Sequence, residues 1–203
     1  MRSADGRYLI LDTTFKTHAA CGLTHDTIDN LLQAKREHGL QAGQVRHIDV
    51  EVPVLHLRVC NIHEPTTGLQ AKFSLRAVAA MTLLGEDTTD IQAYTSALAA
   101  RPALVALRDR VTVTGVEALK SASVTRIELA DGRVISVRSD QRPPGRNPAL
   151  QRDAVSRKFL QLVEPVLGRD AAVALRQRIE SLHTAESVSP LVQGAARRTA
   201  SMA

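Results

Sequence analysis

Hydrophobic and polar positions in the first part of the chain change from a helical to an alternating pattern. Apolar residues recur at steps of three and four from Thr24 to Gly39, which predicts a helix that Thr24 caps and Gly39 ends. Apolar and polar residues then alternate from Gln44 to Val52, as in a half-buried strand. The alternation resumes over Leu55–Val59 after Pro53, which predicts a second strand.

The rest of the chain reads as a mixture of helices and strands. In chain order, the predicted elements are a helix over Leu69–Leu84, a helix over Thr88–Ala100, a short helix after Pro102, a strand at Val111–Val113, a hairpin of Val124–Leu129 and Val134–Val137 around Asp131-Gly132, and helices over Leu150–Glu164 and Asp170–His183. Helices grouped between strands that end in a hairpin predict an α+β fold. We expect an antiparallel sheet with helices packed on one face, followed by the C-terminal helices.

The composition is that of a globular chain with an unusually small aromatic content. Of 203 residues, 44% are hydrophobic, yet only 2% are aromatic and none is Trp. Because aromatic side chains bury the largest areas in most cores, this core is thin for its length. A partner surface would complete it.

Charge and cysteine usage narrow the class of protein. The net charge of +5 favours anions in general. Small di- or tricarboxylates fit it, whereas a nucleic-acid interface would be expected to carry stacking aromatic residues and a recognisable motif. No stretch predicts a membrane span or a signal peptide, and two cysteines provide neither a disulfide framework nor a zinc site. We therefore expect a cytoplasmic protein with reduced thiols, which binds neither nucleic acid nor membrane.

Reactive side chains are densest directly before the first helix. Lys16, His18, Cys21 and His25 lie within about ten residues, and a helix N-terminus offers unpaired N–H groups to an anion. The alternative is structural: Thr24 caps the helix, Cys21 is a small buried hydrophobe and Lys16 is solvated. Residue types alone leave both interpretations open.

A second candidate segment runs from Cys60 to Leu75. Lys72 and Arg76 are one helical turn apart, so they would place two cations on one face of the predicted helix, either at a site or on a solvated surface. The adjacent His63 and Glu64 have poor spacing for a metal, and Ser74 lacks the glycines of a nucleophile elbow. We expect no metal site here.

Three segments together resemble the C-terminal domain of the MmgE/PrpD family, which includes 2-methylcitrate dehydratase, cis-aconitate decarboxylase and iminodisuccinate epimerase. The resemblance covers about residues 8–192. Its motifs read Phe15-Lys16-x-His18-x-x-Cys21-x-x-Thr24-His25-x-x-Ile28-Asp29, then Pro65-x-x-Gly68-x-x-Ala71-Lys72-Phe73-Ser74-Leu75, then Pro144-Gly145-x-Asn147-Pro148 with Arg157-Lys158-Phe159.

The resemblance implies a lyase-type reaction on a polycarboxylate without metal or organic cofactor. It assigns catalytic roles to Lys16 and His25, and substrate binding to His18, Cys21 and Lys72. Family members pair this α+β domain with a larger all-helical domain and tend to be dimers, with the active site between the domains. The chain then contains only part of a site, and we expect it to be silent or very weak alone.

The resemblance also gives the domain limits and the alternatives. Residues 1–184 correspond to the family domain, and residues 185–203 are expected to form a flexible tail. Many members have Tyr where this chain has Ala77, so one hydrogen bond to substrate is missing. The alternative function is a non-catalytic module that binds a carboxylate or a protein. The expected partners are a small di- or tricarboxylate and either a helical-domain partner or a second copy.

Overall fold

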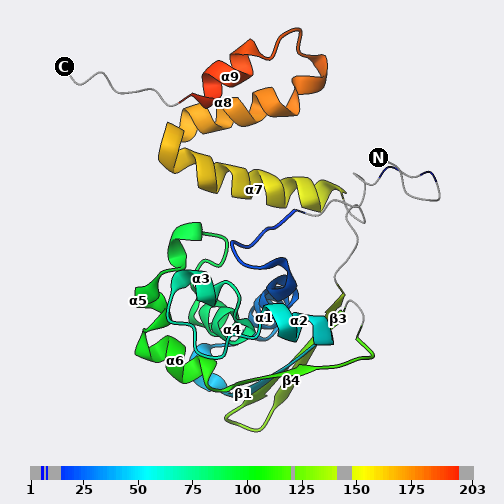
Figure 1. Ribbon diagram of the computed structural model, residues 1–203, viewed down its shortest axis with the longest axis vertical. Helices are drawn as coiled ribbons and strands as arrows, with labels where there is room; N and C mark the ends of the chain where they lie inside the picture. Colours follow the sequence, from blue (N-terminus) through cyan, green and yellow to red (C-terminus); the bar gives the residue numbers. More distant parts are fainter. Residues whose placement is uncertain (1–5, 7, 9–14, 120–121, 141–147, 197–203) are drawn as a thin grey trace. The chain divides into compact units, whose positions relative to one another are not determined.

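The computed structural model describes residues 6, 8, 15–119, 122–140 and 148–196 (Figure 1). The chain forms two compact units, Met1–Pro144 and Gly145–Ala203. The family-domain limit that we predicted at residue 184 stays a prediction.

The first unit contains four strands and a series of short helices. Its elements are η2 (Gly22–Thr24), α1 (His25–His38), η3 (Ala42–Gln44), β1 (Val45–Val52), α2 (Val54–Val59), α3 (Gly68–Ala71), α4 (Leu75–Leu84), η4 (Ile91–Ala93), α5 (Ser96–Ala99), α6 (Pro102–Arg108), β2 (Val111–Gly115), β3 (Ala122–Leu129) and β4 (Val134–Asp140). The α+β class predicted from the sequence is confirmed.

The sheet has the order β2-β1-β3-β4 and is mixed. β3 pairs antiparallel with both β1 and β4, as expected, whereas β1 pairs parallel with β2. A parallel pair needs a long connection, and here the chain between the two strands forms α2 to α6. The site segments after β1 therefore belong to this crossover.

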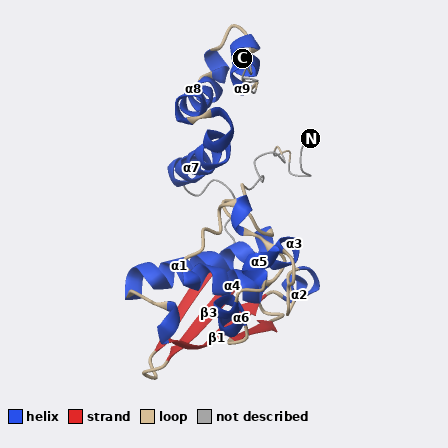
Figure 2. Cartoon of the chain, turned by 90° about the vertical axis from the view of Figure 1, so that its left-hand side faces the viewer, coloured by secondary structure: helices blue, strands red, loops and turns tan. Residues whose placement is uncertain are grey.

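Helices cover one face of the sheet. Figure 2 shows α1, α4 and α6 on the same side of the strands, and α1 packs on β3 and β4 while α4 packs on β2. The core between them is aliphatic, with Ile28, Leu31, Ile48 and Ile127 fully buried. Tyr94 is the one aromatic side chain among the buried core residues that the structure describes, which agrees with the low aromatic content.

The predicted second strand over Leu55–Val59 is wrong, because these residues form helix α2. Pro53 precedes the helix as its N-cap residue, and β1 has no further ladder partner after Val52. The helix instead packs against the end of β2, where a Cβ at Gly115 would lie 2.7 Å from Leu57 Cδ1. As a result, the side chain of His56 points into the protein interior and is buried.

Two predicted helices are interrupted. The helix expected over Leu69–Leu84 is divided into α3 and α4, because Ser74 is extended and its hydroxyl accepts a hydrogen bond from Ala77 N at 3.1 Å, starting a new helix. The helix expected over Thr88–Ala100 contains only η4 and α5, since Asp90 and Thr95 cap two separate short turns.

Other predicted elements are confirmed. Helix α1 ends at Gly39, which adopts a positive φ of 63°. The β3–β4 hairpin turns at Asp131-Gly132, where Gly132 has a φ of 86°. Helix α6 begins at Pro102, and β2 contains Val111 and Val113.

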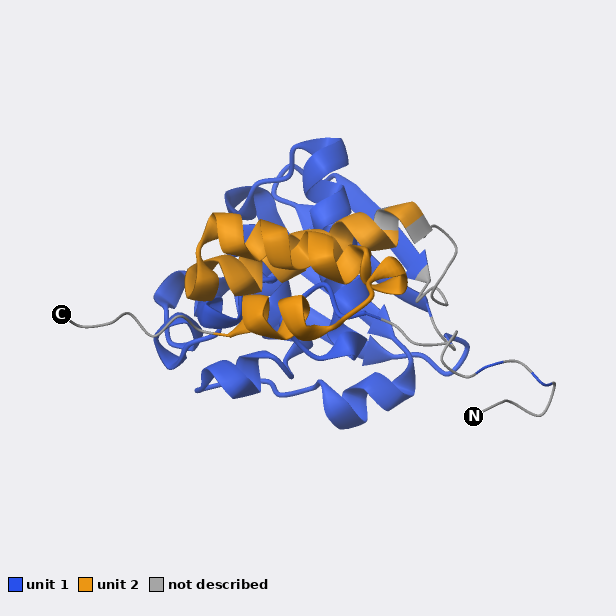
Figure 3. Ribbon diagram, turned by 90° about the horizontal axis from the view of Figure 1, so that it is seen from above, with its two compact units in different colours: residues 1–144 blue, residues 145–203 orange. Residues whose placement is uncertain are grey.

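The second unit is helical and is drawn in orange in Figure 3. It contains α7 (Pro148–Leu167), α8 (Arg169–Glu180), η5 (Leu182–Thr184) and α9 (Ser189–Ala195). The two predicted C-terminal helices are confirmed as α7 and α8. Part of the segment expected to be a flexible tail forms α9, and residues 197–203 lie outside the described residues. In the part of the chain that the structure describes, every helix is too short or too polar to cross a membrane.

Candidate functional site

Two backbone hydrogen bonds join the segment before α1 to distant parts of the first unit. Ala19 N donates to Thr88 O at 2.8 Å, and Cys21 N donates to Lys72 O at 3.0 Å. The second bond joins the two candidate segments of the sequence, one before α1 and the other from Cys60 to Leu75. Cys21 and Lys72 thus lie together in the fold.

The start of α1 is built around Cys21 and Thr24. Thr24 occupies the N-cap position, but its hydroxyl makes no cap and donates to Cys21 O at 2.8 Å instead. The side chain of Lys16 is exposed and passes over Gly22, where an added Cβ would lie 3.7 Å from Lys16 Cε. Thr24 therefore occupies the predicted N-cap position but does not make the capping hydrogen bond. Lys16 lies beside the turn that carries Cys21.

His18 is buried and its ring is held from two sides. Nδ1 is 2.8 Å from Thr88 Oγ1, and Nε2 is 3.1 Å from Asp29 Oδ1. The ring packs edge-to-face against the half-buried His25, with centroids 5.0 Å apart. Both ring nitrogens of His18 are thus engaged with protein groups, while its ring orients His25.

Lys72, whose carbonyl accepts from Cys21 N, lies beside Tyr94. Its Nζ is 5.2 Å from the centre of the Tyr94 ring, a cation–π distance. Burial, helped by the negative charge of Asp87, raises the pKa of Tyr94, so its hydroxyl stays protonated and donates to Thr88 O at 3.1 Å. Thr88 therefore connects the surroundings of Lys72 to His18.

The expected pairing of Lys72 and Arg76 on one helix face is wrong, because Lys72 is the C-cap residue of α3 whereas Arg76 lies in α4, after the break at Ser74. The guanidinium of Arg76 donates to Asn61 Oδ1 at 2.6 Å, and burial lowers its pKa. Arg76 thus holds the chain after Cys60 in place.

Two residues of this neighbourhood have no role in the sequence prediction. His56 is buried, hydrogen-bonds to the backbone of Leu23, and has a pKa lowered mainly by burial. Cys60 is fully buried and its thiol lies close to that of Cys21. The wrong strand prediction over Leu55–Val59 concealed His56, because it turned this side chain outward, and Cys60 is named in the sequence prediction only as the start of the second candidate segment.

The arrangement can bind an anion and move a proton. Lys16 and Lys72 supply positive charge, and His25 supplies an imidazole at the first residue of a long helix. Among the described residues, no group of three or more His, Cys, Asp or Glu side chains could hold a metal ion.

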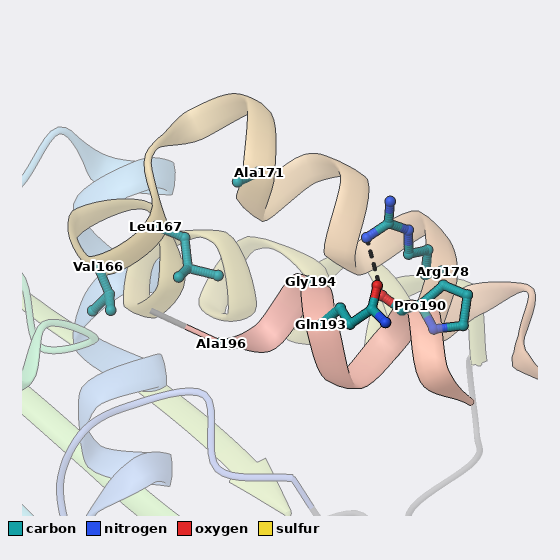
Figure 4. A pocket seen from close by; sticks show the side chains of 8 residues that line it. All are labelled: Val166, Leu167, Ala171, Arg178, Pro190, Gln193, Gly194 and Ala196. Atoms are coloured by element: carbon teal, nitrogen blue, oxygen red, sulfur yellow. Dashed lines mark hydrogen bonds between the residues drawn. The ribbon is translucent and has the colours of Figure 1, made fainter. Parts of the chain in front are cut away.

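A separate cavity of about 470 Å³ lies in the second unit, between α7, α8 and α9 (Figure 4). Its lining is mostly small and aliphatic, and its arginine, Arg178, donates to Pro190 O at 3.2 Å. A Cβ at Gly194 would lie 2.5 Å from Arg178 Nη1, the flexible end of that side chain. None of the predicted site residues lines this cavity.

Comparison with protein-family models identifies the family of this chain. Residues 18–184 match the model of the MmgE/PrpD C-terminal domain. The chain belongs to the MmgE/PrpD family. A search of curated proteins gives no match.

The MmgE/PrpD motifs correspond to definite structural features. The first motif carries the Lys16–His25 segment and Asp29, the partner of His18. In the second motif Gly68 is required by packing, because a Cβ there would overlap the carbonyl group of Tyr94. Ala77, where many members have Tyr, is fully buried in α4. In the third motif, Pro144-Gly145-x-Asn147 lies outside the described residues.

Proposed function

We propose that this chain supplies one side of the active site of a cofactor-independent polycarboxylate lyase of the 2-methylcitrate dehydratase type. The reaction class is dehydration, decarboxylation or epimerisation beside a carboxylate. The observation that carries the proposal is the meeting of Lys16, Lys72 and a histidine pair at one backbone junction, within a domain of the MmgE/PrpD family.

Each residue has a role in this reaction. Removal of a proton beside a carboxylate creates negative charge that spreads onto that carboxylate, and fixed cations stabilise it. Lys16 and Lys72 pair with substrate carboxylates, and Cys21 lines the wall between them. His25 accepts the proton and returns it to the leaving hydroxide in a dehydration, so that water departs.

The resemblance implies that His18 binds substrate, and this role stays a prediction. We propose a positioning role for His18 in addition. Its hydrogen bonds to Asp29 and Thr88 favour a positioning role, since they occupy both nitrogens and hold the ring against His25.

Exposed hydrophobic residues next to the site support a covering partner. Phe15, Val59 and Leu69 are each exposed, and they lie close in sequence to Lys16, Cys60 and Lys72. Apolar side chains gathered around a polar site favour a protein surface above it. We propose that a helical-domain partner or a second copy completes the site, and that the chain alone is silent or very weak because half a site does not position its substrate.

Binding of carboxylates provides the first test. Citrate and succinate are titrated at low ionic strength, and the rise in Tm is measured for the wild type, Lys16→Ala and Lys72→Ala. We expect the rise to be lost in both variants. Arg36→Ala is the matched control, because Arg36 is exposed near the opposite end of α1, roughly 16 Å along the helix from His25. An equal rise in all four proteins contradicts the site.

Reconstitution separates an enzyme from a non-catalytic carboxylate-binding module. The chain is mixed with an all-helical domain of the family, and dehydration of 2-methylcitrate is followed. Activity that appears on mixing and is lost in His25→Ala supports the lyase. Carboxylate binding without activity on mixing supports the module.

A further inference from the structure

The two cysteines of the chain meet at the candidate site although they are far apart in the sequence. The thiol of Cys60 lies close to that of Cys21. Hydrogen bonds of the backbone hold both residues: Cys21 N donates to Lys72 O, Cys60 N donates to His56 O at 2.7 Å, and Cys60 O accepts from Leu75 N at 3.0 Å. The thiols are therefore held beside each other by the fold.

The two thiols have different surroundings. Cys21 is half-buried, in the turn that Lys16 passes over. Cys60 is fully buried, and burial together with the neighbouring Cys21 raises its pKa, whereas the charge of Lys16 acts in the opposite direction. Because Cys21 is the more exposed of the two thiols, a reagent from solvent meets Cys21 first. Cys60 is shielded but lies within reach of Cys21.

We propose that Cys21 and Cys60 form a redox modification site, at which hydrogen peroxide converts the thiol pair into a disulfide. The Cys21 thiolate attacks the peroxide, the O–O bond breaks, and Cys21 becomes a sulfenic acid while hydroxide leaves and takes up a proton. The Cys60 sulfur then attacks the Cys21 sulfur, the S–O bond breaks, and the thiol proton of Cys60 leaves with the hydroxyl as water. One peroxide is reduced to two waters for each disulfide formed.

The modification acts on the candidate site whatever reaction this site performs. A disulfide would fasten the segment before α1 to the end of α2, and it would remove the Cys21 thiol from the wall that carries Lys16. Oxidation thereby alters the binding surface through a covalent link within one chain. This proposal goes beyond the lyase function and does not depend on it.

Mass spectrometry of the full chain provides the test. After brief treatment with hydrogen peroxide and removal of excess reagent, we expect the intact mass to fall by about 2 Da, and dithiothreitol to reverse the change. Digestion without reduction should yield the peptide pair linked through Cys21 and Cys60. The oxidised chain should also have a higher Tm than the reduced chain.

Two variants assign the roles of the cysteines. In Cys60→Ser, Cys21 should stop at the sulfenic acid, a gain of about 16 Da that dimedone traps. In Cys21→Ser, Cys60 should stay unmodified because it is buried. A wild-type chain that forms only disulfides between chains, or in which Cys21 gains oxygen without linking to Cys60, overturns the proposal.

Discussion

The rings of His18 and His25 pack edge-to-face, with ring planes at 84° and centroids 5.0 Å apart. The contact is well defined because His18 is itself fixed by Asp29 and Thr88. The most buried histidine of the first motif therefore supports the more accessible one. This pair therefore links the stability of the fold to the proposed site.

The first prediction compares two histidine–aspartate pairs that differ in burial. His18 and Asp29 are 3.1 Å apart and the His18 side chain is 5% exposed, whereas His47 and Asp49 are 3.2 Å apart and the His47 side chain is 36% exposed. We expect His18→Ala to lower the free energy of unfolding by about 2–3 kcal/mol, since it leaves a cavity and breaks buried hydrogen bonds. His47→Ala should change it by less than about 0.5 kcal/mol. Urea denaturation measures both, and equal losses would contradict the assigned burial.

The second prediction concerns the pH dependence of stability at His56. Burial lowers the pKa of His56 in the folded chain, so the unfolded chain binds the proton more readily. His56 therefore makes its full contribution to the free energy of unfolding above the pKa that it has in the unfolded chain, about 6.5. This contribution is lost as the pH falls from there toward the lower pKa of His56 in the folded chain. We expect the free energy of unfolding to fall below pH 6.5 by at most about 1.4 kcal/mol per pH unit from this residue.

His56→Gln should remove this part of the pH dependence, measured by urea denaturation between pH 5 and pH 8. The matched control is Leu55→Ala, on the exposed side of α2, which adds or removes no titratable group. Its curve should run parallel to that of the wild type. A His56→Gln curve that also runs parallel would show that His56 does not titrate differently on folding.

The third prediction tests the packing of Gly68. A Cβ there would overlap the carbonyl of Tyr94 and lie 2.9 Å from Thr95 N, and these backbone atoms have little freedom to move. We expect Gly68→Ala to destabilise the chain by about 2 kcal/mol or more. Gly43→Ala is the control, because no atom lies within 4 Å of its added Cβ, and it should be neutral or slightly stabilising. Thermal unfolding distinguishes the two.

The fourth prediction concerns α9 in the second unit. Arg178→Ala removes the hydrogen bond to Pro190 O, so we expect α9 to open about fivefold to tenfold more often. Cleavage by thermolysin before Leu191 or Val192 should accelerate accordingly. Arg169→Ala, at the exposed start of α8, should leave the rate unchanged. Equal rates in the two variants would contradict a role for Arg178.

The elements that could be predicted are those whose local signals agree with their packing. The turn at Asp131-Gly132 and the helix end at Gly39 depend on a positive φ, which residue type alone indicates. The parallel β1–β2 pair could not be predicted, because it depends on how the intervening helices pack. Likewise α2 has a pattern that fits a strand, and only the absence of a ladder partner after Val52 and the space at Gly115 favour a helix.

The candidate site could be predicted in part. Lys16, His18, Cys21 and His25 are close in sequence, so their clustering was visible. The joining of Cys21 to Lys72 and Cys60 is a tertiary contact, for which neither periodicity nor charge gives a signal. The positioning role of His18 likewise depends on Thr88, a residue without any mark of function in the sequence.

The parallel pairing of β1 with β2 has a consequence for the order of folding. The β3–β4 hairpin closes over a few residues and forms early, whereas β1 and β2 meet only after a long loop has closed, which is entropically costly and slow. Cys60, Lys72, Thr88 and Tyr94 all lie inside that loop. We therefore expect the site to mature in the last and slowest step, so that a chain with a formed hairpin can still lack its binding surface.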